Sequence, residues 1–307
     1  MPLLSIVTPA YNEAANLPVL HQRLSLALGA LGGEWEWIVV DDHSADDTFT
    51  VLKGLAAADS HVKALRLARN FGSHVAIYCG IQQARGDAII VIAADLQDPP
   101  ELITSLVDKW RQGAQIVWAV RGRREGEPAS ALGFARLYYW LMRRMGIAGP
   151  ATETGSDFFL LDRQVADVLD RFNESHVNVF VLLAWMGFRQ QSVVYDKERR
   201  LHGRSGWTLE KKLKLAIDSV TSFTYFPIRA MSYLGVVVAL IGFAYAIVVA
   251  ANAFAGNPVQ GWSSLMVVVL VVGGMQMLMM GVLGEYVWRA LAEARRRPRY
   301  VVEERVP

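Results

Sequence analysis

One stretch of this chain lacks charged side chains over a length that soluble domains rarely allow. From Ala230 to Gly284 the sequence contains no Asp, Glu, Lys or Arg, and a turn-forming segment from Gly256 to Gly261 interrupts it once. Each side of the interruption exceeds the about 20 apolar residues that cross a bilayer. The alternative is a buried helical hairpin in a soluble core, where two such helices in succession are rare. We therefore predict two transmembrane helices within 230–288, at about 230–254 and 262–286.

Basic residues flank this hairpin on both outer sides and are absent from its turn. They are Lys211, Lys212, Lys214 and Arg229 before it, and Arg289, Arg295, Arg296, Arg297 and Arg299 after it. Cytoplasmic flanks are enriched in Lys and Arg, so both ends should face the cytoplasm. The N-terminus has neither the basic region nor the long apolar run of a signal peptide. The predicted location is the inner (cytoplasmic) membrane, with several crossings and with the first domain and both termini cytoplasmic.

Length, charge and cysteine content exclude several classes of protein. The 307 residues suffice for one sizeable domain and an appendage, and the formal net charge of +2 gives no basic field for a nucleic-acid partner. Cys79 is the only cysteine. A single cysteine excludes an internal disulfide and a multi-cysteine metal site, and it fits a reducing compartment.

The first 200 or so residues alternate short β-branched runs with longer amphipathic stretches, which is typical of strands and crossover helices in a mainly parallel α/β sheet. The predicted strands are Ser5–Thr8, Trp37–Val40, Lys63–Leu67, Ala88–Ile92 and Ile116–Val120. The predicted helices are Leu17–Leu28, Asp47–Ala57, His74–Gln83 and Glu101–Gln112. Ligands bind at the carboxyl ends of strands in such sheets, so the residues that follow each strand are the candidates for a site.

Three acidic clusters follow three of these strands: Tyr11-Asn12-Glu13, Asp41-Asp42-His43-Ser44 and Asp95-Leu96-Gln97-Asp98. Carboxylates there can bind ribose hydroxyls or, with a metal ion between, diphosphate oxygens. Any one cluster could instead cap the helix that follows it. Three of them at corresponding strand ends favour a ligand site.

A basic amphipathic segment connects this domain to the hairpin. Within 206–229, Leu209, Leu213, Ile217, Val220 and Phe223 share one helical face, and lysines lie on another. We interpret this segment as a helix in the membrane interface, with an ordinary surface helix as the alternative. The predicted layout is a domain over 1–205, this helix over 206–229, the hairpin over 230–288 and a basic cytoplasmic tail over 289–307.

Five motifs in order resemble the family 2 glycosyltransferases, in particular those that use polyprenyl phosphates, such as dolichyl-phosphate mannose synthase and related bacterial membrane enzymes. They are Pro9–Glu13, Asp41–Ser44, Arg69-Asn70-Phe71-Gly72, Ala94–Glu101 and the tail from Gly284-Glu285-Tyr286 to Arg297-Pro298. The resemblance implies a GT-A fold, a divalent cation (Mg²⁺ or Mn²⁺), and inverting transfer of a sugar from a nucleotide-diphosphate sugar to a polyprenyl (undecaprenyl) phosphate. It also implies a homo-oligomer, for which a tetramer is one form.

The resemblance assigns roles on the donor side. Pro9, Ala10, Tyr11 and Glu13 would line the nucleoside pocket, Asp42 would contact the base or ribose, and Asp95 and Gln97 would hold the metal against the diphosphate. Many family members have a second acid two residues before Asp95, whereas this chain has Ala93. That departure leaves one carboxylate and an amide, so the metal should bind mainly through the substrate.

On the acceptor side, arginine guanidinium groups suit phosphate oxygens. Arg121 and Arg136, together with Arg200 and Ser205 of an Arg-x-x-Gly-x-Ser stretch, would bind the lipid phosphate by the resemblance, although loop arginines are often merely solvated. Asp157 matches a family acid near the acceptor and would orient or deprotonate the nucleophile. The predicted catalytic residues are therefore Asp157, Asp95 and Arg121.

Two other functions remain open at this stage. A processive polysaccharide synthase shares the motifs up to Asp98, but its Gln-x-x-Arg-Trp motif is absent here. A non-catalytic sugar-nucleotide-binding membrane subunit would explain Ala93, but the retained Asp95, Gln97 and Asp157 favour an enzyme. The sequence does not discriminate between sugars or between UDP, GDP and dTDP donors.

Overall fold

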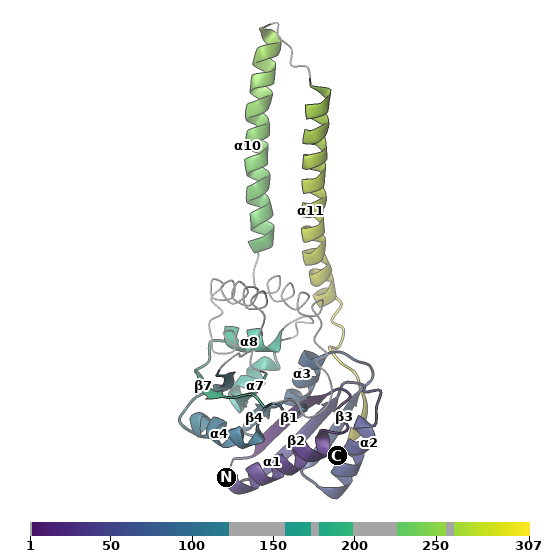
Figure 1. Cartoon of the computed structure of the whole chain (residues 1–307), viewed down its shortest axis with the longest axis vertical. Helices are drawn as coiled ribbons and strands as arrows, with labels where there is room; N and C mark the ends of the chain where they lie inside the picture. The colour runs from purple at the N-terminus through teal and green to yellow at the C-terminus, as the bar shows by residue number, and fades with distance from the viewer. Residues whose placement is uncertain (1, 123–156, 173–177, 199–225, 256–260) are drawn as a thin grey trace. The chain divides into compact units, whose positions relative to one another are not determined.

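A computed structural model describes the chain except for residues 1, 123–156, 173–177, 199–225 and 256–260. The chain forms two compact units (Figure 1). The first consists of Met1–Ser219 together with Pro298–Pro307, and the second consists of Val220–Arg297. The end of the chain therefore belongs to the same unit as its beginning.

The first unit is built on one eight-stranded sheet with the order β7-β5-β6-β4-β1-β2-β3-β8. The strands are β1 (Leu4–Ala10), β2 (Trp35–Asp41), β3 (Val62–Leu67), β4 (Ala88–Val91), β5 (Ile116–Arg121), β6 (Phe159–Asp162), β7 (Gln190–Tyr195) and β8 (Val302–Val306). β1 pairs in parallel with β2 and β4, β2 with β3, and β5 with β7. β6 pairs antiparallel with β4 and β5, and β8 pairs antiparallel with β3.

These pairings put most functional candidates on one edge of the sheet. β5 and β7 run in the same direction as β1, because β6 reverses the direction once and β5 reverses it again. The carboxyl ends of β1, β2, β3, β4, β5 and β7 therefore share an edge with the first residues of β6 and β8. We call this edge the carboxyl edge.

Helices between the strands follow the burial pattern of their sequences. They are α1 (Leu17–Leu31), α2 (Thr48–Ala58), α3 (Ser73–Gln83), η1 (Pro100–Leu102), α4 (Ile103–Arg111), α7 (Arg163–Leu169) and α8 (Val179–Trp185). In α1, Leu17, Leu20, Leu24 and Leu28 recur at helical spacing and are buried in the core beneath the sheet. The helix ends at Gly32, whose φ of 67° is a left-handed conformation that glycine adopts without strain.

The five predicted strands and the first three predicted helices are present. The fourth predicted helix, Glu101–Gln112, divides into η1 and α4. The prediction missed β6, β7 and β8. Residues 289–307 were predicted to be a basic tail, but their first part continues a helix to Ala294 and their last part is β8.

The second unit contains two long helices, α10 (Phe226–Phe254) and α11 (Trp262–Ala294). Ile228–Val249 and Leu265–Ala294 are long and apolar enough to cross a membrane. Large side chains along them, including Phe243 and Leu278, are more than half exposed within the chain. Because so much exposed apolar surface is unfavourable in water, the two helices are consistent with a membrane hairpin.

Candidate active site

Three turns at the carboxyl edge share an unusual backbone conformation. Asn12 follows β1, His43 follows β2 and Leu96 follows β4, and their φ angles are 58°, 59° and 60°. Left-handed backbone is uncommon for residues other than glycine and is an outlier for a bulky side chain such as leucine. Leu96 is fully buried, so packing of its side chain holds the turn that carries Asp95 and Gln97.

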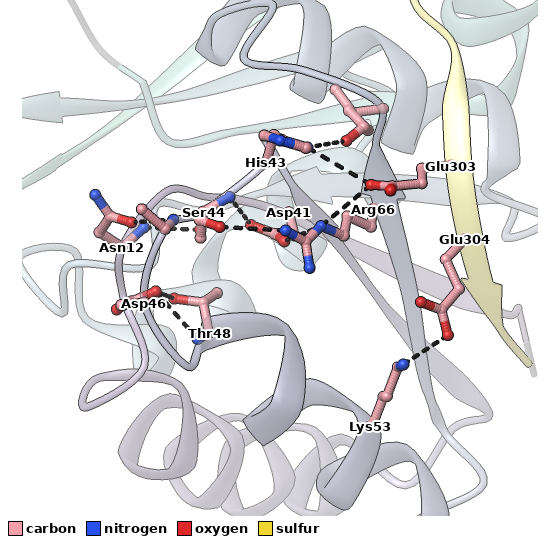
Figure 2. Close-up of polar contacts among 12 residues, drawn as sticks. Asn12, Asp41, His43, Ser44, Asp46, Thr48, Lys53, Arg66, Glu303 and Glu304 are labelled. Atoms are coloured by element: carbon pink, nitrogen blue, oxygen red, sulfur yellow. Dashed lines mark hydrogen bonds and ion pairs between the residues drawn. The ribbon is translucent and has the colours of Figure 1, made fainter.

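The turns after β1 and β2 are bonded to each other. The Asn12 backbone N–H donates to Ser44 Oγ (2.9 Å), and Ala45 N–H donates to Asn12 Oδ1 (2.9 Å). Ser44 N–H in turn donates to Asp41 Oδ1 (2.9 Å). The buried Asp41 carboxylate thus holds the turn after β2, and Ser44 joins that turn to the turn after β1 (Figure 2).

The residues predicted to bind the nucleoside gather around this pair of turns. Pro9 and Ala10 end β1, and Tyr11 follows with 48% of its surface exposed. The Glu13 backbone N–H donates to Thr48 Oγ1 (2.8 Å), which joins this turn to the start of α2. Ala10 is buried, and its carbonyl accepts the Asp42 N–H (2.9 Å). Tyr11 is therefore the side chain of this group with the most surface to offer a ligand.

Asp42 is committed to the protein backbone. Its Oδ1 accepts the Phe71 N–H (2.7 Å) and its Oδ2 accepts the Gly72 N–H (2.8 Å). Burial raises the pKa of Asp42, and these two donors oppose the rise. The side chain thus holds the turn of the Arg69-Asn70-Phe71-Gly72 motif, and any contact with a base or ribose must use its remaining lone pairs.

Asp95 and Gln97 lie beside each other after β4. Asp95 is 8% exposed, and its Oδ1 accepts the Gln97 backbone N–H (3.2 Å). Gln97 also exchanges two hydrogen bonds with Glu198, from Glu198 N–H to its carbonyl (2.8 Å) and from its side-chain amide to the Glu198 carbonyl (3.4 Å). Arg23 of α1 holds the Glu198 carboxylate at 3.0 Å, so the chain after β7 is fixed against the metal-site candidates.

A second group of charges lies along the carboxyl edge near β5, β6 and β7. Asp157, just before β6, has its Oδ1 3.6 Å from both Arg121 Nη2 and Lys197 Nζ. Lys197 Nζ is also 3.5 Å from Asp98 Oδ1, which accepts a hydrogen bond from the Tyr195 hydroxyl. We call these five residues the acid–base cluster.

The cluster perturbs its own titration. Burial raises the pKa of Asp98 to about 6, the negative charge of Asp157 adds to the rise, and Lys197 and Tyr195 oppose it. Burial opposes the charged form of Arg121, but the carboxylates of Asp157 and Asp98 outweigh that effect and raise its pKa. Two cations and two carboxylates therefore share a partly buried site.

The sequence prediction covered this region unevenly. Arg121 and Asp157, both predicted for the acceptor side, lie together. Asp98 was predicted only as part of an acidic cluster, and Tyr195 and Lys197 were not predicted. Tyr195 and Lys197 come at the end of β7, which the sequence did not predict. Arg136, Arg200 and Ser205 lie outside the described residues, as does most of the predicted interfacial helix over 206–229.

The mainly parallel sheet and the acidic turns along its carboxyl edge are the arrangement expected of a GT-A glycosyltransferase. The Glycosyl transferase family 2 model matches residues 5–170, and the chain belongs to that family. It is 39% identical to the "Uncharacterized glycosyltransferase YkcC" of Bacillus subtilis, over 98% of this chain and 93% of that protein. It is 35% identical to the "Bactoprenol glucosyl transferase" of Shigella phage SfV, over 98% of both chains.

A solved structure supports the fold. The glucosyl-3-phosphoglycerate synthase from Mycobacterium tuberculosis, in complex with Mn²⁺, uridine diphosphate and phosphoglyceric acid, has a TM-score of 0.50 and 19% identity. The similarity covers 70% of this chain and 75% of that one. The protein is therefore a GT-A glycosyltransferase whose chain also carries two apolar helices.

Proposed function

We propose that the protein transfers a sugar from a nucleoside-diphosphate sugar to a polyprenyl phosphate, with inversion at the anomeric carbon. The product would be a polyprenyl-monophosphate sugar for cell-envelope glycan or lipid modification. Relatives named bactoprenol glucosyl transferase, at 35% identity over 98% of this chain, support a polyprenol-derived acceptor. The observation that carries the proposal is the pair of cations in the acid–base cluster.

These cations suit an acceptor that is itself an anion. Arg121 and Lys197 both lie 3.6 Å from the Asp157 carboxylate, so a phosphate placed beside Asp157 would be within reach of both. The acceptor's phosphate oxygen is already anionic near neutral pH and needs little base strength from Asp157. Asp157 would mainly orient the cations, while the phosphate oxygen attacks the anomeric carbon and the bond to the diphosphate breaks.

The donor would lie along the turns after β1, β2 and β4. Tyr11 would contact the nucleoside, and Asp95 would face the diphosphate at the end of β4. A bound divalent cation would neutralise the charge that grows on the leaving diphosphate, and Asp95 and Gln97 would hold it. Within the described residues no cluster of three or more His, Cys, Asp or Glu side chains could hold a metal ion. One carboxylate and an amide oxygen fit a cation that binds chiefly through substrate phosphates, as Mg²⁺ usually does.

The Ala93→Asp variant tests this metal arrangement. Ala93 is partly buried two residues before Asp95, and a carboxylate there would add a second charged oxygen ligand. We expect the Mn²⁺ concentration for half-maximal transfer to fall by about threefold to tenfold. Ala93→Asn is the matched control, because it has a similar size and no charge. Equal Mn²⁺ requirements in the two variants would contradict the placement of the metal at Asp95.

The hairpin would keep the site near the acceptor headgroup. The sheet supports the same side of the membrane for both flanks of the hairpin, because β3 precedes the hairpin and its partner β8 follows it. If both α10 and α11 cross the membrane, the two flanks lie on one side, and the basic flanking residues favour the cytoplasmic side. The oligomeric state, a homo-oligomer by the family resemblance, is measurable on the same detergent-purified protein.

Transfer of radiolabel to undecaprenyl phosphate tests the proposed function. The full chain is incubated with UDP-glucose first, then with other UDP-, GDP- and dTDP-sugars, in Mg²⁺, Mn²⁺ or EDTA. We expect one donor to label the lipid phase and EDTA to abolish the label. The anomeric configuration of the sugar in the product should be inverted relative to the donor. Absence of lipid label with every donor would refute the proposed function.

A further inference from the structure

The last strand of the sheet is irregular beside the nucleoside end of the site. In the register of β3 with β8, Leu67 pairs with Val302 and Arg66 pairs with Glu304, so Glu303 is an extra residue without a partner in the register. This irregularity is a β-bulge, a device that redirects a side chain and often lies next to a site. It lies at the carboxyl edge, because β8 begins where β3 ends.

The bulge directs Glu303 at residues of the two neighbouring strand ends (Figure 2). Its Oε2 is 3.3 Å from Arg66 Nε and 3.6 Å from His43 Nδ1. Arg66 belongs to β3, and His43 is the left-handed residue of the turn after β2. One carboxylate from the C-terminus therefore contacts two elements that border the turns of the proposed donor site.

Arg66 transmits this contact to the Asp41 turn. Its Nη2 donates to the Ser44 carbonyl (3.4 Å), and its Nε is 3.8 Å from the fully buried Asp41 Oδ2. Neither Arg66 Nε nor Asp41 Oδ2 has a hydrogen-bond partner among the residues that the structure describes. The position of the Arg66 guanidinium is thus set by the Ser44 carbonyl and by two ion pairs, one of which is to Glu303.

The same turn determines the position of the β1 turn. Asp41 Oδ1 holds Ser44 N–H, and Ser44 Oγ holds Asn12 N–H, both at 2.9 Å. Tyr11 is the neighbour of Asn12. A displacement of Arg66 would therefore be passed to Tyr11, at the nucleoside end of the site, through these two hydrogen bonds.

We propose that Glu303 is a positioning residue of the donor site and that β8 completes the nucleoside-binding end of the sheet. The inference rests on the proposed function in one respect, namely that this edge binds a nucleoside diphosphate. Glu303 acts chiefly through Arg66 and contacts no substrate itself. The C-terminal strand is thereby a specific part of the donor site in addition to covering the edge of β3.

The neighbouring glutamate is a matched control. Glu304 Oε1 pairs with Lys53 Nζ of α2 at 2.6 Å, and both side chains are nearly half exposed, as Glu303 is. Both glutamates belong to the same strand, and each forms at least one partly exposed ion pair. Glu304 meets Arg66 through the backbone register, but of the two carboxylates only that of Glu303 forms ion pairs with Arg66 and His43.

The test is nucleotide binding by the full chain in detergent. Calorimetry with UDP, GDP and dTDP in Mn²⁺ identifies the nucleotide that binds the native protein, and that nucleotide is then used for the variants. We expect Glu303→Gln to raise its Kd by about threefold to fivefold, as loss of a partly exposed ion-pair network would do. Glu304→Gln should leave the Kd unchanged. In the Arg66→Gln background, Glu303→Gln should add little, because its effect passes through Arg66.

Kinetics separate positioning from a merely structural role. Glu303→Gln should raise the KM for the donor and leave the KM for the polyprenyl phosphate unchanged. Its melting temperature should equal that of Glu304→Gln. Equal nucleotide affinity in the two glutamine variants, or an equal effect on both substrates, overturns the inference. Failure to bind any of the three nucleotides also overturns it. Nucleotide binding without transfer would instead refute the proposed function. The comparison of nucleotide affinities would then still decide the role of Glu303.

Discussion

Replacing Asp95 with alanine should lower transfer by roughly a thousandfold or more, while the protein remains folded. Asp95 is the only carboxylate that the proposed metal site contributes, since Ala93 replaces the second acid. Charge neutralisation by a metal supplies several kilocalories per mole to such a displacement, and each 1.36 kcal/mol is about a tenfold change in rate. The measurement is single-turnover transfer of label to undecaprenyl phosphate at saturating donor.

The control for this variant is Asp108→Ala, which removes an exposed carboxylate from α4 of the same unit. It should retain native transfer. Asp95→Asn should restore little activity, because an amide keeps the shape but lacks the charge that the cation requires. Native transfer by Asp95→Ala, or activity in EDTA equal to that in Mn²⁺, would exclude Asp95 from the metal site.

Replacing Lys197 with methionine should destabilise the protein by about 3 kcal/mol and reduce transfer by about a hundredfold. The Lys197 side chain is only 14% exposed and lies between two carboxylates, 3.5 Å from Asp98 and 3.6 Å from Asp157. Methionine has a similar length and no charge, so the buried Asp98 loses this cation, while Asp157 keeps Arg121 as a neighbour. Thermal unfolding in detergent measures the first effect, and the transfer assay measures the second.

A second substitution separates the two effects of Lys197. Asp98→Asn removes one carboxylate charge and keeps an oxygen that can accept the Tyr195 hydrogen bond. The Lys197→Met/Asp98→Asn double variant should therefore recover most of the lost stability, but its transfer should stay low because the phosphate-binding cation is still missing. Lys197→Arg should retain both. If the single variant keeps native stability and transfer, Lys197 is neither a structural counter-ion nor a phosphate ligand.

Much of the fold was readable from the sequence because burial and periodicity coincide in its first half. Trp37–Val40 and Ala88–Ile92 are apolar on both faces, as strands covered by helices must be, and both are buried strands. The donor-side motifs were found for the same reason, since they follow these strands directly. Asp42 shows the limit, because the sequence did not reveal that two backbone N–H groups occupy its oxygens.

The remaining part of the site depends on pairing between distant segments. β7 reads Gln-Gln-Ser-Val-Val-Tyr, which is too polar at its start to identify as a strand. Lys197 was therefore not recognised as a residue that follows a strand. β8 reads Val-Glu-Glu-Arg-Val, with the charges that edge strands often carry. Neither segment shows a strand pattern in isolation. Their partners β5 and β3 lie far away in the sequence.

The closing position of β8 also has a consequence for how the protein is made. β3 emerges from the ribosome early, but the strand that covers its outer edge is synthesised only after both helices of the hairpin. Until then the N–H and C=O groups along that edge are unpaired and available to another chain. A truncated polypeptide that lacks β8 would carry this open edge permanently. Synthesis of β8 is therefore the step that protects the edge of β3 from intermolecular pairing.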